Sequence, residues 1–288
     1  MQLYGKSVTP AVDEGAKGEE NSKIINEAIE KLSSKNGGTV VIPAGEYKVS
    51  TIELKSDVAL FVLKGAKLVS LKCEENETSE NPLNEAVVIA NDASNISVTG
   101  GGIRCGSGES YTNDAEAEEP LYALEEFNMY TRVIEARKRI RFAKDTARNH
   151  ILKLNNCTDV NINNIILNES AIWMLAINGC DDVQVDHCYF FMPNDGMTYG
   201  YSGIAIESAD GSVIENVNIS DIEMDGISSP FLIWIGNRLK YDEKNVGGIS
   251  IKNIDAKNAE MPSAITGCEV DGKTYYVENV SIENFSVV

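Results

Sequence analysis

The chain has 288 residues, 43% hydrophobic and 24% charged, and this ordinary globular composition excludes fibrous and low-complexity proteins. Its 44 acidic and 25 basic residues give a formal net charge of −19, which disfavours binding to nucleic acid or to an acidic membrane surface. The longest apolar run, residues 171–177, is far shorter than the roughly 20 residues that a membrane-spanning helix needs, so we expect no membrane partner.

The first predicted element is a helix over residues 21–34. Apolar residues recur there at helical spacing, namely Ile24, Ile25, Ala28, Ile29 and Leu32. We expect Asn36-Gly37-Gly38 to end this helix. Short strands bounded by Gly, Asn, Asp or Ser are then predicted at residues 39–43, 47–54, 58–63, 86–90 and 96–99. This succession is typical of an all-β chain.

A sequence repeat becomes visible after residue 150. Residues 150–164 (HILKLNNCTDVNINN) align with residues 173–187 (WMLAINGCDDVQVDH), which places Cys157 and Cys180 in equivalent positions. A related pattern recurs at Val217, Ile249 and Val280. A period of roughly 20–30 residues built from short strands is typical of a solenoid, whereas a propeller blade needs about 40–50.

These features predict a right-handed parallel β-helix capped at its N-terminal end by the helix. Strands through residues 150–285 should be parallel, and the inward side chains should stack in rows, among them Leu152, Leu154, Leu175 and Ile177. We expect one domain over residues 1–288. Residues 1–38 would form the N-terminal segment and capping helix, and residues 39–288 the coils, with a charged insertion at about 109–148.

Several conspicuous residues have a structural reading. Most of the asparagines in Asn-x-Ser/Thr triplets are expected at turns, where Asn tolerates left-handed geometry, rather than as glycosylation sites. These are Asn76, Asn95, Asn156, Asn168, Asn218, Asn279 and Asn284. The matched Cys157 and Cys180 favour stacked core residues over a disulfide or a metal site. With only two histidines, His150 and His187, the sequence predicts no metal site and no cofactor.

Cellular location stays open. Residues 1–6 show no basic flank followed by an apolar stretch, so no secretory leader is visible. Six sparse cysteines without CxxC spacing favour reduced thiols, which suit the cytoplasm. A secreted protein whose leader has been removed is the alternative.

Both ends of the chain resemble a known family. Residues 37–47 (GGTVVIPAGEY), 52–60 (IELKSDVAL), 65–68 (GAKL) and 95–103 (NISVTGGGI) resemble the opening coils of glycoside hydrolase family 28, the polygalacturonase-like enzymes. Residues 230–238 (PFLIWIGNR), 247–254 (GGISIKNI) and 263–267 (SAITG) resemble the last coils of bacterial members. The resemblance, which spans roughly residues 21–288, implies a β-helix that hydrolyses glycosidic bonds, typically in pectin, with inversion.

The centre of the chain departs from the family pattern. Members carry an Asn-x-Asp-Gly motif, then an Asp-Asp pair, a Gly-His-Gly and an Arg-x-Lys on successive coils. This chain has Pro193-Asn194-Asp195-Gly196, one residue short of the first motif, and then reaches residues 202–208 (SGIAIES). That stretch resembles the coil that normally bears Arg-x-Lys, so the coils between are absent. The pair Asp181-Asp182 occupies a turn position matched by Thr158-Asp159 one repeat earlier.

The catalytic candidates are therefore Asp195, by resemblance, and Glu207, the next carboxylate on a coil. Inverting hydrolysis needs an acid and a base about 6.5–9.5 Å apart, and side chains of neighbouring coils can supply them. The alternative is that residues 194–196 form a simple turn. Candidate substrate contacts are Trp173, Tyr199, Tyr201, Asp210 and Arg238, and for the aromatic ones a buried or rim-filling role is the alternative.

A basic cluster stands out against the acidic background. Residues 132–148 hold seven basic and two acidic side chains, a local charge of +5. Arg137 and Arg141 could hold an anionic uronate polymer by charge-assisted hydrogen bonds. A solvated helical face paired with the preceding acidic run is the alternative.

The sequence thus predicts a glycoside hydrolase acting on pectin-like or other uronic-acid-containing glycans, with a carbohydrate as partner. The alternative is a carbohydrate-binding β-helix protein that has lost the catalytic coils.

Overall fold

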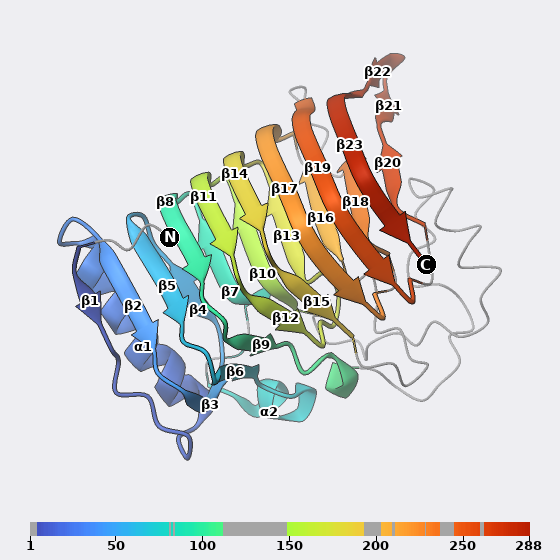
Figure 1. The fold of residues 1–288 in the computed structure, drawn as a ribbon. Coiled ribbons are helices and arrows are strands. Elements are labelled where there is room, and N and C mark those ends of the chain that lie inside the picture. The colour runs from blue at the N-terminus through green and yellow to red at the C-terminus, as the bar shows by residue number, and fades with distance from the viewer. Residues whose placement is uncertain are drawn as a thin grey trace.

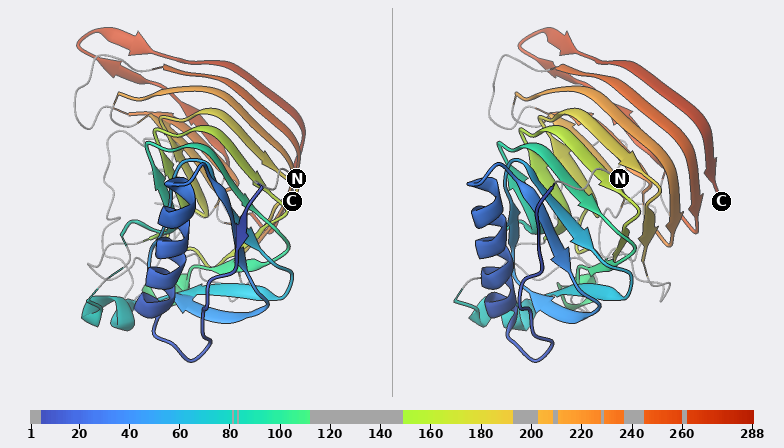
Figure 2. Two further views of the ribbon diagram at one scale, coloured as in Figure 1. Left: turned by 90° about the vertical axis from the view of Figure 1, so that its left-hand side faces the viewer. Right: turned by 60° about the vertical axis from the view of Figure 1, so that its left-hand side comes forward.

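The computed structural model describes residues 5–80, 82, 84–111, 149–192, 203–208, 211–227, 229–236, 245–259 and 262–288. They form a right-handed parallel β-helix with three sheet faces, as predicted (Figures 1 and 2). Each coil runs from face 1 through face 2 to face 3, and equivalent strands of successive coils pair in parallel.

Face 1 contains β1 (Ser7–Val8), β2 (Gly38–Ile42), β5 (Val58–Val62), β8 (Ser94–Thr99), β11 (Thr158–Asn163) and β14 (Asp181–Asp186). Face 2 contains β3 (Gly45–Val49), β6 (Ala66–Ser70), β9 (Ile103–Cys105), β12 (Ile166–Asn168) and β15 (Tyr189–Phe191). The long strands β17 (Val213–Asp225), β19 (Asn245–Lys257) and β23 (Val277–Val287) extend over both faces.

Face 3 contains β4 (Ile52–Leu54), β7 (Ala86–Asn91), β10 (His150–Asn155), β13 (Leu175–Asn178), β16 (Ile204–Ser208), β18 (Phe231–Ile235) and β20 (Ala264–Thr266). Two short helices, α2 (Cys73–Thr78) and the 3-10 helix η1 (Gly108–Tyr111), lie between face 2 and face 3 strands. One antiparallel hairpin, β21 (Cys268–Val270) with β22 (Lys273–Tyr275), departs from the predicted parallel arrangement. It joins β20 to β23 and does not belong to the coil sheets.

The capping helix α1 (Gly18–Ser33) packs its apolar side against β2, β3 and β4, with Ile25 and Ile29 fully or nearly fully buried. It begins three residues before the predicted start. The first turn is polar, so the spacing of apolar residues, on which the prediction was based, does not reveal it. Instead, the Glu20 side chain accepts a hydrogen bond from the Lys17 backbone N–H (3.3 Å) and so caps this turn. The side chain of Asn21 donates to the carbonyls of Asp13 and Lys48.

The single strand predicted over residues 47–54 is wrong, because the chain turns a corner there. Strand β3 ends at Val49 and β4 starts at Ile52. Between them, the Thr51 hydroxyl donates to the Ala86 carbonyl (2.9 Å) and accepts from the Asn84 N–H (2.7 Å), which ties the corner to the next coil. The alternation of inward and outward side chains continues through this corner, so the sequence pattern does not reveal it.

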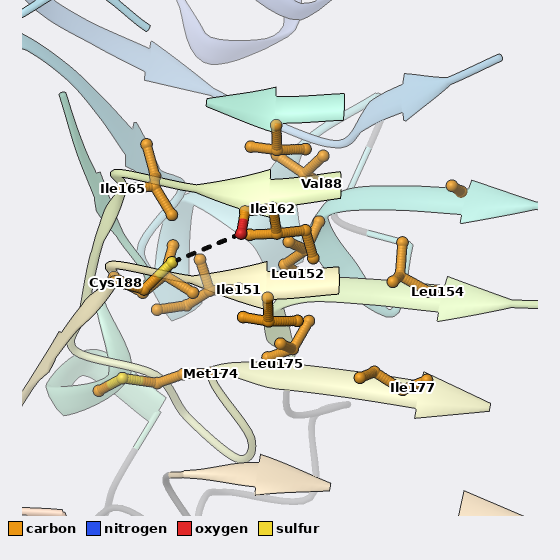
Figure 3. Close-up of a cluster of buried hydrophobic side chains, with 14 of the residues drawn as sticks. Val88, Ile151, Leu152, Leu154, Ile162, Ile165, Met174, Leu175, Ile177 and Cys188 are labelled. Atoms are coloured by element: carbon orange, nitrogen blue, oxygen red, sulfur yellow. Dashed lines mark hydrogen bonds between the residues drawn. The ribbon is translucent and has the colours of Figure 1, made fainter. Parts of the chain in front are cut away.

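Stacked rows of inward side chains form the core, as the repeat predicts. Leu152 pairs with Leu175 and Leu154 with Ile177, and all four are fully buried (Figure 3). Cys157 and Cys180 are free thiols at equivalent buried positions, and the Cys157 N–H donates to the Cys180 sulfur (3.3 Å). The prediction of stacked core cysteines is therefore confirmed.

Left-handed residues mark the corner between face 1 and face 2. In each of the last five coils one residue there has a φ of 50–56°, namely Asn164, His187, Asp221, Asn253 and Asn284. The Asn253 amide donates to Asp221, and the Asn284 amide donates to Asn253, both at 2.9 Å. Among the seven Asn-x-Ser/Thr asparagines, four have left-handed geometry, namely Asn95, Asn156, Asn279 and Asn284. The same turn-forming property therefore recurs along the helix axis.

Arg104 interrupts an apolar row on face 2. It stacks between Leu68 and Leu167 and is fully buried, and none of its three guanidinium nitrogens has a hydrogen-bond partner in the described part of the chain. Burial lowers the pKa of Arg104 to about 9. A buried cation without a partner opposes folding, so this position destabilises the coil that contains it.

We expect Arg104→Met to raise the free energy of unfolding at pH 7 by about 1–4 kcal/mol, because an apolar chain of similar length replaces an unpaired charge. The pKa of Arg104 in the folded protein lies below the ordinary value of 12.5. The buried charge therefore lowers the free energy of unfolding by its full amount below pH 9, and by less as the pH rises further. The advantage of the variant should therefore shrink at pH 10. Urea denaturation at both pH values measures this, with Lys67→Met on the outer side of face 2 as the control. A variant less stable than wild type at pH 7 would contradict the assignment.

Candidate functional site on face 3

Face 3 has two outward rows with different properties. The first runs through Ile89, Lys153, Ala176, Ala205 and Leu232, which are in register on successive strands. Its apolar members are 0–2% exposed although they point away from the core. This row is therefore covered and offers no open surface.

The second row is polar and accessible. It runs through Asn91, Asn155, Asn178 and Glu207, and we call these four residues the amide strip. The Asn155 amide donates to the Asn91 oxygen (2.7 Å), and the Asn178 amide donates to the Asn155 oxygen (2.9 Å). Each ladder bond uses one N–H of a side chain that has two, so donors and lone pairs remain for a ligand.

Glu207 lies at the end of the amide strip. It occupies β16 between Asn178 on one coil and Trp234 on the next, and its side chain is partly exposed. Trp234 is 4% exposed, and a Cβ placed on Gly236 would lie 2.3 Å from its indole ring. Only glycine therefore permits the close packing that holds this ring beside Glu207. No sequence signal within residues 230–238 singles out Trp234 or Gly236.

The described strands of face 3 provide no second carboxylate close enough to Glu207 for a catalytic pair. The other strand carboxylate is Glu53 on β4, four strands away, or about 19 Å at the usual strand spacing. An inverting pair is about 6.5–9.5 Å apart. Glu207 and Glu53 therefore do not form a catalytic pair.

Most of the predicted site residues lie outside the described residues, namely Asp195, Arg137, Arg141, Tyr199, Tyr201, Asp210 and Arg238. In the sequence, each of these residues belongs to a segment that directly precedes or follows a strand of face 3. Residues 112–148 precede β10, residues 193–202 precede β16, residues 209–210 follow β16, and residues 237–244 follow β18.

Trp173 is 3% exposed and hence buried, which agrees with the alternative considered for it. In the described part of the chain, no group of three His, Cys, Asp or Glu residues could hold a metal ion. Likewise, none of the described helices is both long and apolar enough to span a membrane.

No family model matches the chain, and no curated protein sequence matches it. Solved structures do match. The chain is similar to a predicted glycosyl hydrolase from Parabacteroides merdae, with a TM-score of 0.59 and 18% identity over 87% of this chain and 97% of the other. It is also similar to a hyperthermoactive exopolygalacturonase from Thermotoga maritima, with a TM-score of 0.54 and 18% identity over 99% and 82%.

A third similar structure is the tailspike protein of E. coli bacteriophage HK620 in complex with a pentasaccharide. The TM-score is 0.59 and the identity 13%, over 96% of this chain and 47% of the tailspike. At such identities the likeness establishes the fold, and membership of glycoside hydrolase family 28 stays a prediction.

The amide strip yields a prediction of its own. Replacing Asn155 by Ala removes both ladder hydrogen bonds, and because water can reach the strip we expect a loss of about 1 kcal/mol in the free energy of unfolding. Asn218→Ala, at an exposed position of β17, is the matched control and should change stability by less than about 0.5 kcal/mol. Equal effects of the two substitutions in urea denaturation would count against a structural ladder.

Proposed function

We propose that this protein is a glycoside hydrolase that binds uronic-acid-containing glycans along the amide strip and cleaves them with Glu207 and Asp195. The main support for this proposal is the position of Glu207. Its partly exposed carboxylate lies at the end of a row of amide side chains on the outer side of face 3. Successive strands lie about 4.8 Å apart, so the row presents hydrogen-bonding groups at regular intervals to an extended polymer.

Asp195 is the proposed partner because of its place in the chain. It lies in the segment that leads directly into β16, the strand that carries Glu207. One of the two carboxyl groups would protonate the leaving oxygen, and the other would activate a water molecule on the opposite side of the sugar. Similarity to an exopolygalacturonase fold supports this class of substrate.

A test of this mechanism compares Asp195→Asn and Glu207→Gln with wild type on a panel of pectic and neutral oligosaccharides. Each substitution removes one of two groups that act together, so each should lower turnover by about 10²-fold or more while thermal stability changes little. Glu53→Gln is the control, because Glu53 lies on the same face but too far from Glu207 to take part. Activity that survives Asp195→Asn would show that the pairing is wrong.

Binding without cleavage is the second candidate function. It is favoured by the finding that Glu207 has no second carboxylate within hydrolytic reach on the described strands of face 3. Calorimetric titration with the same oligosaccharides separates the two functions, since binding with no product across the whole panel would identify a glycan-binding protein.

The charge of the ligand gives a further prediction. If Arg137 and Arg141 hold uronate groups, Arg137→Glu with Arg141→Glu should abolish binding of oligogalacturonate, and wild-type binding should weaken steeply as salt rises. Lys31→Glu with Lys35→Glu at the end of α1 changes the net charge equally and should leave binding intact. Binding that is independent of salt, or tight binding by the first double variant, would reject this role.

A further inference from the structure

The outer side of face 2 carries an aromatic surface that no sequence motif indicates. Strands β9, β12, β15 and the second half of β17 lie side by side there, paired in parallel and in register (Figure 1). Side chains alternate along each strand, so Arg104, Leu167, Phe190 and Met224 point into the core. Their neighbours along each strand point outward.

The aromatic pair is on β15. Tyr189 and Phe191 flank the buried Phe190 and therefore emerge on the same outer side, each partly exposed. Their ring centroids are 6.1 Å apart and their planes differ by 14°. Two nearly parallel rings held by one strand form a rigid aromatic surface on the protein exterior.

Apolar side chains extend this surface toward the N-terminal coils. Ile103 on β9, Ile166 on β12 and Tyr189 on β15 are paired in register, and each is partly exposed. Together with Phe191 they form an apolar cluster, while Asn168 is the polar outward residue in register with Phe191. Apolar side chains that gather on an exposed face are typical of an interaction site.

The next coil on the other side is acidic. Glu223 pairs with Tyr189, and Asp225 pairs with Phe191, so both carboxylates lie one strand spacing from the rings. Asp255 follows on β19 beside Lys257, with which it forms a salt bridge of 3.4 Å. Burial, followed by the charges of Asp225 and Glu223, raises the pKa of Tyr189. The phenol therefore stays protonated at neutral pH and can donate a hydrogen bond.

We propose that Tyr189, Phe191, Glu223 and Asp225 form a binding site for neutral glycans, separate from the amide strip on face 3. The apolar C–H side of a pyranose ring packs on the aromatic rings, as apolar surfaces do on aromatic faces. Its hydroxyl groups donate to Glu223 and Asp225, and hydrogen bonds to ionised acceptors are the stronger ones.

The same charges determine which glycans are excluded. The surface next to the rings has three carboxylates and one ammonium group, namely those of Glu223, Asp225, Asp255 and Lys257. The ammonium group of Lys257 is already paired with Asp255. A uronate polymer would bring further negative charge to these carboxylates and be repelled. The site therefore selects uncharged sugars, in contrast to the substrate class proposed for face 3.

The test is calorimetric titration of the full chain with cellohexaose and mannohexaose as neutral probes and hexagalacturonate as the charged probe. We expect one or both neutral probes to bind, with an affinity that hardly changes with salt. Tyr189→Ala with Phe191→Ala should weaken this binding about 10- to 100-fold. Asp225→Asn should weaken it less, whereas Tyr189→Phe should largely retain it because the ring persists.

Tyr276→Ala is the matched control, because it removes a tyrosine that is 66% exposed on the C-terminal part of the chain, and it should leave binding unchanged. Thermal unfolding of each variant verifies that the fold is intact. The proposal is overturned if neither neutral probe binds, or if the aromatic double variant binds as tightly as wild type. It is also overturned if that variant instead dissociates an oligomer in size-exclusion chromatography, because the surface would then be an interface between copies of the chain. Cleavage by Glu207 and Asp195 is scored separately by product formation, so either proposal can fail without the other.

Discussion

Each coil of this protein depends on its neighbours to bury its inward side chains. A single coil is only one layer of backbone thick, so the rows through Leu152 and Leu175, or Leu154 and Ile177, leave water only when coils stack in register. Parallel pairing makes this stacking specific, because a slip by one residue would exchange the inward and outward sets. The capping helix α1 packs against β2, β3 and β4 and buries its apolar side there.

The same register carries outward side chains into rows, and these rows differ in chemistry from face to face. On face 3, amides lead to Glu207. On face 2, the aromatic pair of β15 lies next to two carboxylates of β17. Because neighbouring coils are separated by one strand spacing, two residues that are 34 positions apart, such as Tyr189 and Glu223, become direct neighbours. The chemistry of this protein is therefore distributed along the helix axis and not along the chain.

The repeat made the fold predictable. Matching residues 150–164 with 173–187 placed Cys157 against Cys180 and identified the inward leucines correctly, since both depend on periodicity alone. Corners were harder, because at Ser50 and Thr51 the alternation continues while the chain changes face. Arg104 could not be foreseen as a core residue, because its charge favours the surface and only its register with Leu68 and Leu167 reveals its burial. Glu207 is predicted as the next carboxylate on a coil after Asp195, whereas its register with Asn178 and Trp234 on neighbouring strands depends on pairing between coils, which a linear motif does not express.

The left-handed corner between face 1 and face 2 makes the coils interchangeable units. Since one residue in each of the last five coils adopts the same backbone geometry, from Asn164 to Asn284, these coils follow the same path through this corner. A gene that lost one or more whole coils would therefore still encode matching ends, and the remaining coils could close over the gap with their core rows intact. Evolution of such a protein can proceed by deleting or duplicating complete coils, which moves functional side chains closer together or further apart by whole strand spacings while the fold persists.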